Sequence, residues 1–416
     1  MSDDALAGAK PVGLIPDGFG CSGGELVVDG IAASELVRQS GGTPAFVYSS
    51  TLVRQRVARL RRAMPRQLGI NYAVKANPFE PLLRLLAPLV DGLDIASGGE
   101  LQFIRQAGID PARVSFAGPG KDDDELACAI AAGVTLNLES EGELDRALTI
   151  AQSQDARLRA ALRVNPDFTL RGSGMKMGGG AKPFGIDAAE VPPLIARLVS
   201  SGADYRGLHI YTGSQALDAS AIISMHGAVL NLAASLADSS GHAPPSLNMG
   251  GGFGIPYFPG DTPLDVEAVG AALSRSFDNL PASLCETQFH IELGRYLVGE
   301  AGVYLTRVLD RKVSHGRVFL VTDGGLHHQL AASGNFGTVV RRNYPVAIAS
   351  RFQAEPEEVA SVVGRLCTPL DRLADDAALP RATPGDLVAV FCAGAYGATA
   401  SPSWFLGHGP AREIVV

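Results

Sequence analysis

LGINYAVKANP, residues 68–78, is the stretch that decides the fold. It begins as an apolar, strand-like run, ends on one charged residue, Lys75, and leads directly into the helix-like segment 78–89. A charge at the end of such a run is costly to bury unless it is paired or used covalently. Lys75 is therefore either a strand-end lysine that reaches solvent or a partly desolvated amine able to condense with an aldehyde.

The same strand–helix alternation continues from about residue 51 to residue 300. Repeated alternation of this kind predicts parallel βα units. About eight such units in series, with no dinucleotide-type glycine pattern at the first turn, favour a (β/α)8 TIM barrel over a doubly wound sheet. We expect its strands at residues 68–74, 92–96, 113–117, 135–138, 158–164, 207–211, 247–249 and 289–293.

The two ends of the chain are strand-rich and punctuated by glycine and proline. Because both ends have this strand-rich pattern and flank the barrel, they indicate one β-domain built from both of them. We therefore predict an α/β protein in three parts. Residues 1–50 contribute strands to the β-domain, residues 51–300 form the barrel, and residues 301–416 form the C-terminal β-domain.

Composition argues against several classes of function. The formal net charge of -8, without a basic cluster, argues against a nucleic-acid partner. The five cysteines are an odd number without CxxC spacing, which indicates reduced thiols and no metal site. The first residues lack an apolar signal region, and we expect no apolar run of transmembrane length. We expect a soluble, cytoplasmic protein with no membrane partner.

Several residues that could take part in catalysis or binding fall at the carboxyl ends of the predicted strands. This is the face on which such barrels carry their active sites. The run NMGGGFG, residues 248–254, is either a flexible turn or a cradle whose backbone N–H groups surround a phosphate. The run IELGR, residues 291–295, is either a surface ion pair or an acid beside a phosphate-binding guanidinium. The other strand-end candidates are Lys75, Asp94 and Tyr211.

The order of the motifs is more specific than any one of them. YAVKAN, DIASGGEL, GSQ, GGGFG, ELGR, a cysteine and GAYG follow one another between residues 72 and 397. In this order the chain resembles the fold-type III pyridoxal-phosphate decarboxylases, the group of diaminopimelate and ornithine decarboxylases, from about residue 44 to about residue 405. The resemblance implies an alanine-racemase-like barrel, pyridoxal 5'-phosphate as cofactor, and decarboxylation of an L-amino acid through an external aldimine and a quinonoid.

The resemblance also implies roles for individual residues. Lys75 matches the lysine that carries the cofactor, and Glu292 matches the acid facing the pyridine nitrogen, which favours decarboxylation over racemisation. Cys367 matches a catalytic cysteine that enters the active site from the neighbouring subunit, which implies a homodimer with shared active sites. The cofactor-binding positions so implied are Lys75, Asp94, Tyr211, Ser214, Gly250, Gly251, Gly252, Glu292, Arg295 and Tyr396.

One departure concerns the residue that stacks on the cofactor ring. Diaminopimelate decarboxylases usually have a histidine three residues before the serine of GSQ, where this chain has Tyr211. His209 stands two residues earlier and shares its face of the strand. Which of the two stacks on the ring stays open at this point. His209 and Arg295 are also candidates for substrate contact.

A larger departure concerns the distal end of the substrate. Cys367 is followed by Thr368 and Pro369 in place of the usual Glu-Ser, and segment 331–334 lacks the usual Arg-Pro. Either Asp371 replaces the missing acid or the distal end needs no ammonium partner.

These features and the glycine-rich insert 172–183, which predicts a mobile loop over the site, resemble a branch of biosynthetic-cluster decarboxylases. That branch includes exosortase-associated enzymes and enzymes acting on a glutamyl group tethered to an acyl carrier protein. We therefore expect a small-molecule or carrier-bound amino-acid substrate, with an acyl carrier protein as the partner in the second case. The alternatives are a diaminopimelate decarboxylase that produces L-lysine, an amino-acid racemase on the same fold, and a non-catalytic relative.

Overall fold

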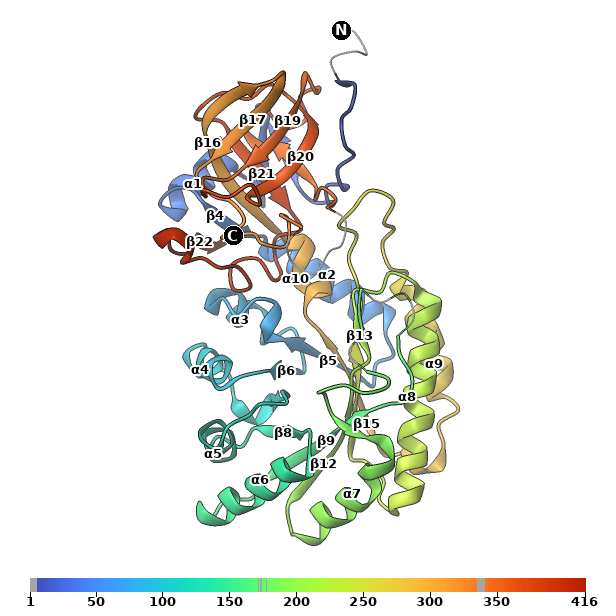
Figure 1. The fold of residues 1–416 in the computed structure, drawn as a ribbon. Helices are drawn as coiled ribbons and strands as arrows, with labels where there is room; N and C mark the ends of the chain where they lie inside the picture. Colours follow the sequence, from blue (N-terminus) through green and yellow to red (C-terminus); the bar gives the residue numbers. More distant parts are fainter. Residues whose placement is uncertain (1–5, 171, 173, 177, 335–340) are drawn as a thin grey trace. The chain divides into compact units, whose positions relative to one another are not determined.

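The computed structural model describes residues 6–170, 172, 174–176, 178–334 and 341–416 (Figure 1). Residues 1–5, on which the expectation of no signal peptide rests, lie outside these ranges. The chain divides into two compact units, a barrel unit and a β-rich unit. The barrel unit comprises Arg56–Ile255 and Pro263–Tyr296, and the β-rich unit comprises Met1–Gln55, Pro256–Thr262 and Leu297–Val416.

Within the described residues, eight parallel strands of the barrel unit close on themselves, because β15 pairs with β5 and β8 pairs with β9. The predicted (β/α)8 barrel is confirmed, and each expected run overlaps one of its strands. In spatial order the strands are β5 (Leu68–Ala73), β6 (Gly92–Ile95), β7 (Val114–Phe116), β8 (Thr135–Leu138), β9 (Arg159–Asn165), β12 (Asp204–Ile210), β14 (Ser246–Gly251) and β15 (Gln288–Leu293).

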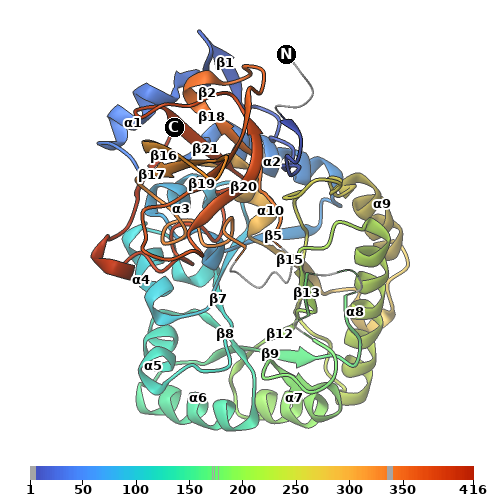
Figure 2. The same cartoon turned by 45° about the horizontal axis from the view of Figure 1, so that its top comes forward.

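Helices surround this barrel (Figure 2). Several begin where the sequence offers a side-chain cap: Asp122 and Glu125 form a capping box at the start of α5, and Ser97 and Ser140 accept N–H bonds at the starts of α4 and α6. The helices are α2 (Ser50–Ala63), α3 (Glu80–Leu86), α4 (Gly98–Gln106), α5 (Asp123–Ala131), α6 (Glu141–Ser153), α7 (Val191–Ser200), α8 (Ala219–Ser240), α9 (Val266–Phe277) and α10 (Arg295–Val298).

Helix α8 corrects one expectation. Its 22 residues, with a mean hydropathy of 1.4, are long and apolar enough to cross a membrane by length and composition. In the structure α8 packs against α7, α9 and β14 of the barrel unit, and half of that apolar stretch is buried. A core helix of a barrel meets the same criteria as a membrane span, so its apolar character is accounted for by packing.

One short strand adds to the barrel sheet, and two others form a separate two-stranded sheet. β11 (Ile186–Asp187) pairs with the end of β9, and β10 (Met175–Lys176) pairs antiparallel with β13 (Gly213–Ser214). The glycine-rich insert is therefore tied through its backbone to the GSQ segment, with Met175 opposite Ser214. Its predicted mobility stays a prediction.

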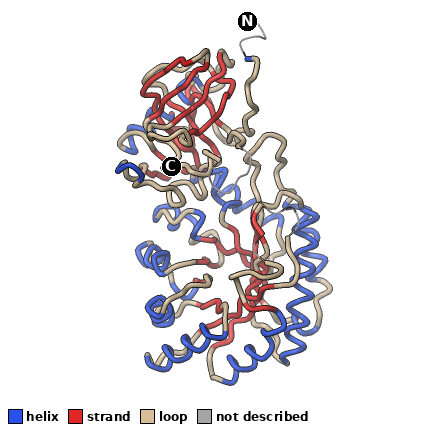
Figure 3. Tube along the Cα trace, in the orientation of Figure 1, coloured by secondary structure: helices blue, strands red, loops and turns tan. Residues whose placement is uncertain are grey.

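The β-rich unit is dominated by strands (Figure 3). Both chain ends enter its main sheet: β4 pairs antiparallel with β16 and parallel with β22. A core that includes Leu26, Val47, Val303 and Phe391 joins N-terminal and C-terminal segments of this unit. Its elements are β1 (Gly20–Ser22), β2 (Glu25–Val28), β3 (Ile31–Ala32), α1 (Ala33–Ser40), β4 (Ala45–Tyr48), β16 (Gly302–Ser314), β17 (Arg317–Thr322), β18 (Val346–Ile348), β19 (Glu358–Val363), β20 (Arg372–Leu379), β21 (Leu387–Phe391) and β22 (Arg412–Val415).

Candidate active site

Lys75 stands just beyond the carboxyl end of β5. The strand ends at Ala73, and a 3-10 turn, Val74–Ala76, buries both of its end residues while leaving 41 % of the Lys75 side chain exposed. The hydroxyl of Tyr72 donates to the carbonyl of Asn77 at 2.8 Å and holds this turn against the strand. The local fold thus presents one primary amine at the barrel mouth.

A buried carboxylate lies beside that amine. Glu292, near the end of β15, exposes 5 % of its side chain. Its Oε1 lies 3.7 Å from Lys75 Nζ, and its Oε2 lies 3.1 Å from His209 Nε2. The lysine ammonium also lies 5.4 Å from the centre of the Tyr211 ring. The structure therefore brings together four side chains from the ends of three strands, β5, β12 and β15.

The charges in this cluster follow from burial and hydrogen bonding. Burial opposes ionisation of Glu292, but the hydrogen bond from His209 and the charges of Lys75 and Arg163 outweigh it and hold the pKa of Glu292 well below its usual range. Burial lowers the pKa of His209 despite its bond to Glu292. A neutral His209 must carry its proton on Nε2 to donate to the carboxylate. Its Nδ1 has no hydrogen-bond partner among the described residues.

Asp94 is the second acid of the cavity and has the opposite character. Burial, reinforced by the charge of Glu292, raises the pKa of Asp94 well above its ordinary value. The hydroxyl of Ser115 on β7 donates to its carboxyl group. The cavity therefore contains two buried carboxyl groups whose pKa values are shifted in opposite directions, upward for Asp94 and downward for Glu292.

The run Gly250–Gly252 at the end of β14 requires glycine for two physical reasons, the backbone conformation and the lack of space for a side chain. Gly250 and Gly252 have φ values of +72° and +85°, which favour glycine. At Gly251 an added Cβ would lie 1.9 Å from the carbonyl oxygen of Glu292. Ser214 lies on β13 in the same unit, and the N–H of Ala216 donates to the carbonyl of Gly252 at 2.8 Å. The backbone of this glycine run is free of side chains and held in place, so its N–H groups can surround a small anion.

A cavity of about 180 Å³ is lined by Lys75, Asp94, His209, Tyr211 and Glu292. Two of its lining residues were missed from the sequence. Arg163, near the end of β9, pairs with buried Glu139 at 2.7 Å, and its guanidinium lies 5.1 Å from the centre of the Phe184 ring. Arg163 carried the same signal as Lys75, a charge within an apolar strand, and that signal could have found it. The lining residues used here are Lys75, Asp94, Arg163, Phe184, His209, Tyr211 and Glu292.

Three predicted site residues belong to the β-rich unit. Cys367 is exposed, and Tyr396 has a φ of 55° in a tight turn. Asp371 is buried, and its carboxylate accepts the N–H groups of Leu326 at 2.6 Å and Leu366 at 2.8 Å. A substrate ammonium would have to compete with these two bonds, which hold two loops of the unit together.

Residues 50–299 match the family described as "Pyridoxal-dependent decarboxylase, pyridoxal binding domain". This range spans the whole barrel and more than half of the chain. The chain belongs to the pyridoxal-dependent decarboxylases. It is therefore a pyridoxal-phosphate-dependent carboxy-lyase that acts on an amino acid.

Individual decarboxylases are similar to this chain over nearly its full length. The L-glutamyl-[BtrI acyl-carrier protein] decarboxylase of Niallia circulans is 35% identical over 379 residues, which cover 90% of this chain and 88% of that protein. The diaminopimelate decarboxylase of Aquifex aeolicus is 34% identical over 397 residues, covering 94% and 91%. The crystal structure of the Helicobacter pylori diaminopimelate decarboxylase complexed with L-lysine superposes with a TM-score of 0.81, at 28% identity and 92% and 94% coverage.

The residues present in this decarboxylase fit pyridoxal phosphate. The cofactor requires a primary amine for its aldehyde, an anion cradle for its phosphate and, for carbanion chemistry, an acid for its ring nitrogen. The barrel supplies an exposed amine on Lys75, a glycine cradle that an added Cβ would fill, and a buried, ionised Glu292. When bound, the cofactor supplies the electron sink that makes loss of CO2 from an amino acid feasible.

Proposed function

We propose that Lys75, Glu292 and Cys367 are the catalytic residues of this decarboxylase. The observation that carries the proposal is the Lys75–Glu292–His209 chain at the carboxyl end of the barrel, with contacts of 3.7 and 3.1 Å. Lys75 holds the cofactor and afterwards carries a proton on Nζ. Glu292 keeps the ring nitrogen protonated, since its charge is maintained by the hydrogen bond from His209.

The remaining assignments concern binding. We propose that Gly250, Gly251, Gly252 and Ser214, together with Arg295 and Tyr396, hold the cofactor phosphate, and that Asp94 lies beside the cofactor. Of the two stacking candidates, Tyr211 is the better supported, because His209 is only 2 % exposed and its Nε2 is committed to Glu292. His209 is then a positioning residue for the acid.

The homodimer is part of the same proposal. Cys367 is exposed on its own chain and has no disulfide partner, as expected for a thiol that completes the site of a second copy. All five cysteines are free thiols, which supports the cytoplasm as the proposed compartment.

We expect complementation between two inactive variants, Lys75→Ala and Cys367→Ala. A hybrid dimer contains one site with both residues intact, so mixing the variants under exchange conditions should restore some CO2 release. The hybrids are isolated with two affinity tags and assayed against each parent. If purified, cofactor-loaded hybrids stay as inactive as the parents, the two residues do not share a site across an interface.

We further propose that the substrate is a conjugated amino acid, such as a glutamyl group on an acyl carrier protein. Thr368 and Pro369 stand where diaminopimelate decarboxylases usually have an acid and a serine, and Ala331 and Ala332 lie where an Arg-Pro pair is usual. A substrate with a free distal ammonium and carboxylate would bury charges without partners, at a cost of several kcal/mol. The relative that acts on a carrier-bound glutamyl group shares 35% identity, which supports the same conclusion.

Steady-state assays with carrier-bound glutamate, free glutamate and meso-diaminopimelate test this proposal. We expect kcat/KM to be highest for the carrier-bound substrate, because a site that lacks polar partners discriminates by up to roughly 10⁴-fold against a ligand that needs them. The apo carrier, added as a competitor, should inhibit if the carrier itself is recognised. A kcat/KM for meso-diaminopimelate of about 10⁴ M⁻¹s⁻¹ or more would instead assign the protein to the diaminopimelate decarboxylases.

A further inference from the structure

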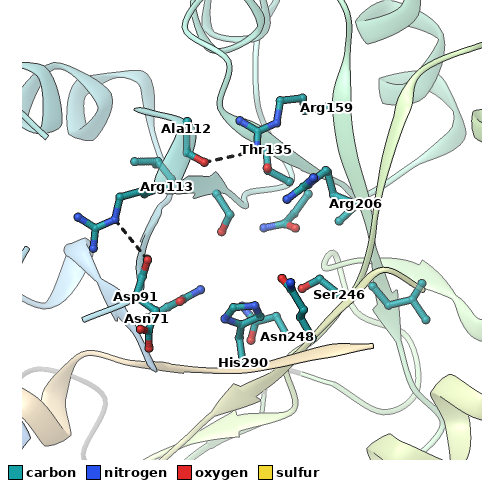
Figure 4. A pocket seen from close by; sticks show the side chains of 17 residues that line it. Asn71, Asp91, Ala112, Arg113, Thr135, Arg159, Arg206, Ser246, Asn248 and His290 are labelled. Carbon is teal, nitrogen blue, oxygen red and sulfur yellow. Dashed lines mark hydrogen bonds between the residues drawn. The ribbon is translucent and has the colours of Figure 1, made fainter. Parts of the chain in front are cut away.

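A second cavity, of about 260 Å³, lies inside the barrel toward the amino ends of its strands (Figure 4). It is separate from the catalytic residues but aligned with them along the strands. His290, Gly92 and Ala161 line it, and each stands two residues before Glu292, Asp94 and Arg163 respectively. Because side chains alternate along a strand, each pair points into the same barrel at two levels.

Small residues keep this level of the barrel open. A Cβ added at Gly69 would lie 2.2 Å from His290 Nδ1, and one added at Gly92 would lie 2.7 Å from Asn71 Oδ1. Barrel interiors of this kind are usually filled by layers of bulky branched side chains. Here glycines give room to polar side chains, and the interior is hollow.

The cavity contains buried polar groups that lack partners. Asn137 is only 3 % exposed, and its Nδ2 has no hydrogen-bond partner among the described residues. His290 Nδ1 likewise has no hydrogen-bond partner among the described residues. Burial lowers the pKa of His290, so that its ring is neutral near pH 7. Buried polar atoms are nearly always bonded to something, so these two groups call for a ligand or for water.

Two arginines at the rim share one acid. Arg159 and Arg206 lie 3.7 and 3.6 Å from the same carboxylate oxygen of Asp204, and their side chains are 22 % and 39 % exposed. Both guanidiniums lie beside the open space of the cavity (Figure 4). Burial, reinforced by Arg206, lowers the pKa of Arg159. Arg159 also donates to the carbonyls of Gly133 and, at 3.4 Å, of Ala112. Arg206 therefore has more N–H groups left for a ligand, because a guanidinium carries five of them.

The other charged side chains at the rim do not neutralise the positive charge of Arg159 and Arg206. Arg113 donates to the carbonyls of residues 87, 90 and 91. Asp91 pairs at 2.6 Å with Arg61, and Asp110 lies close enough to Arg159 to act on its pKa. The set therefore holds four arginines against three aspartates, which leaves one positive charge in excess.

We propose that this amino-terminal cavity binds a small oxyanion, a phosphate or carboxylate group, through the guanidinium of Arg206 at the rim, beside the positive charge of Arg159, and through Asn137 inside. The guanidinium fork matches the paired oxygens of such groups. The amide Nδ2 of Asn137 is a donor with no partner in the part of the chain that the structure describes, and it would bind a further oxygen. The volume admits a free anion or a short organic acid and excludes a bulky ligand. This site is independent of the catalytic assignments proposed above.

The test uses borohydride-reduced holoenzyme, in which the cofactor's own phosphate occupies the catalytic cradle. Calorimetric titrations with inorganic phosphate and, separately, with succinate distinguish the two kinds of oxyanion. We expect saturable binding of at least one of them. Arg206→Gln and Asn137→Ala should each weaken it by about tenfold or more, the effect expected for losing a hydrogen bond to a charged group.

The matched control is Arg59→Gln, because Arg59 is an exposed arginine that already has its own partner, Glu267, at 2.9 Å. It should leave the affinity unchanged, and circular dichroism checks that every variant is folded. Absence of saturable binding to the wild-type protein would overturn the proposal and identify a water-filled cavity. Equal affinities for the wild type and both cavity variants, or an equal loss in Arg59→Gln, would overturn it as well.

Discussion

Lys75→Ala should abolish covalent attachment of the cofactor and nearly all decarboxylation. The visible absorbance band and the borohydride-reducible adduct should both disappear, because the turn at Val74–Ala76 presents this one amine beside Glu292. Loss of the group that also carries a proton should slow CO2 release by roughly 10²- to 10⁴-fold, the usual effect for one positioned acid–base group. Absorbance, reduction followed by peptide mapping, and CO2 release give three readings of the same change.

Lys75→Arg is the matched variant, since it keeps the positive charge near Glu292 but offers no primary amine. It should be as inactive as the alanine variant while keeping more of its stability. Lys182, an exposed lysine of the barrel unit, serves as the control, and Lys182→Ala should retain the adduct. A reducible adduct in Lys75→Ala would show that another lysine anchors the cofactor.

Glu292→Gln should retain the cofactor but slow decarboxylation strongly. The carboxylate is buried and receives the hydrogen bond of His209 at 3.1 Å, so its charge is available to the ring nitrogen without competition from water. Removing one charged partner from a buried pair costs roughly 3–5 kcal/mol. This corresponds to roughly a 10²- to 10⁴-fold slower reaction if the whole loss is felt in the transition state. Single-turnover CO2 release measures it directly.

The matched control for this variant is Glu100→Gln. Glu100 on α4 is also an acid of the barrel mouth, but its Oε2 accepts the N–H of Ala96 at 2.6 Å. Its replacement should cost far less than that of Glu292. Because the pKa of Glu292 is held well below its usual range, its carboxylate stays charged as the pH falls through that range, and mild acid should not reproduce the effect of the substitution. A near-wild-type rate in Glu292→Gln would mean that the ring nitrogen has another partner.

The barrel could be predicted from the sequence because it depends on local pattern, and the same kind of pattern pointed to Lys75 as the proposed cofactor anchor. The alternation of short apolar runs with amphipathic segments identified the strands of the barrel, and the isolated charge after Val74 identified Lys75. Sequence pattern was less informative about α8, whose apolar length is typical of a core helix and of a membrane span alike. Only its packing against α7, α9 and β14 separates the two.

The pairings within the site could not be predicted, because they join residues far apart in the chain. His209 and Glu292 are separated by 83 positions and Arg163 and Glu139 by 24, and each pair meets only when strands from different parts of the chain come together. Closure buries these charges in one cavity, where neighbours decide their protonation. The sequence by itself determined the fold class and the family, because periodicity and motif order are properties of the chain. The tertiary structure alone decided which acid has a raised pKa and which a lowered one, because pKa values depend on burial and on neighbours brought together by folding.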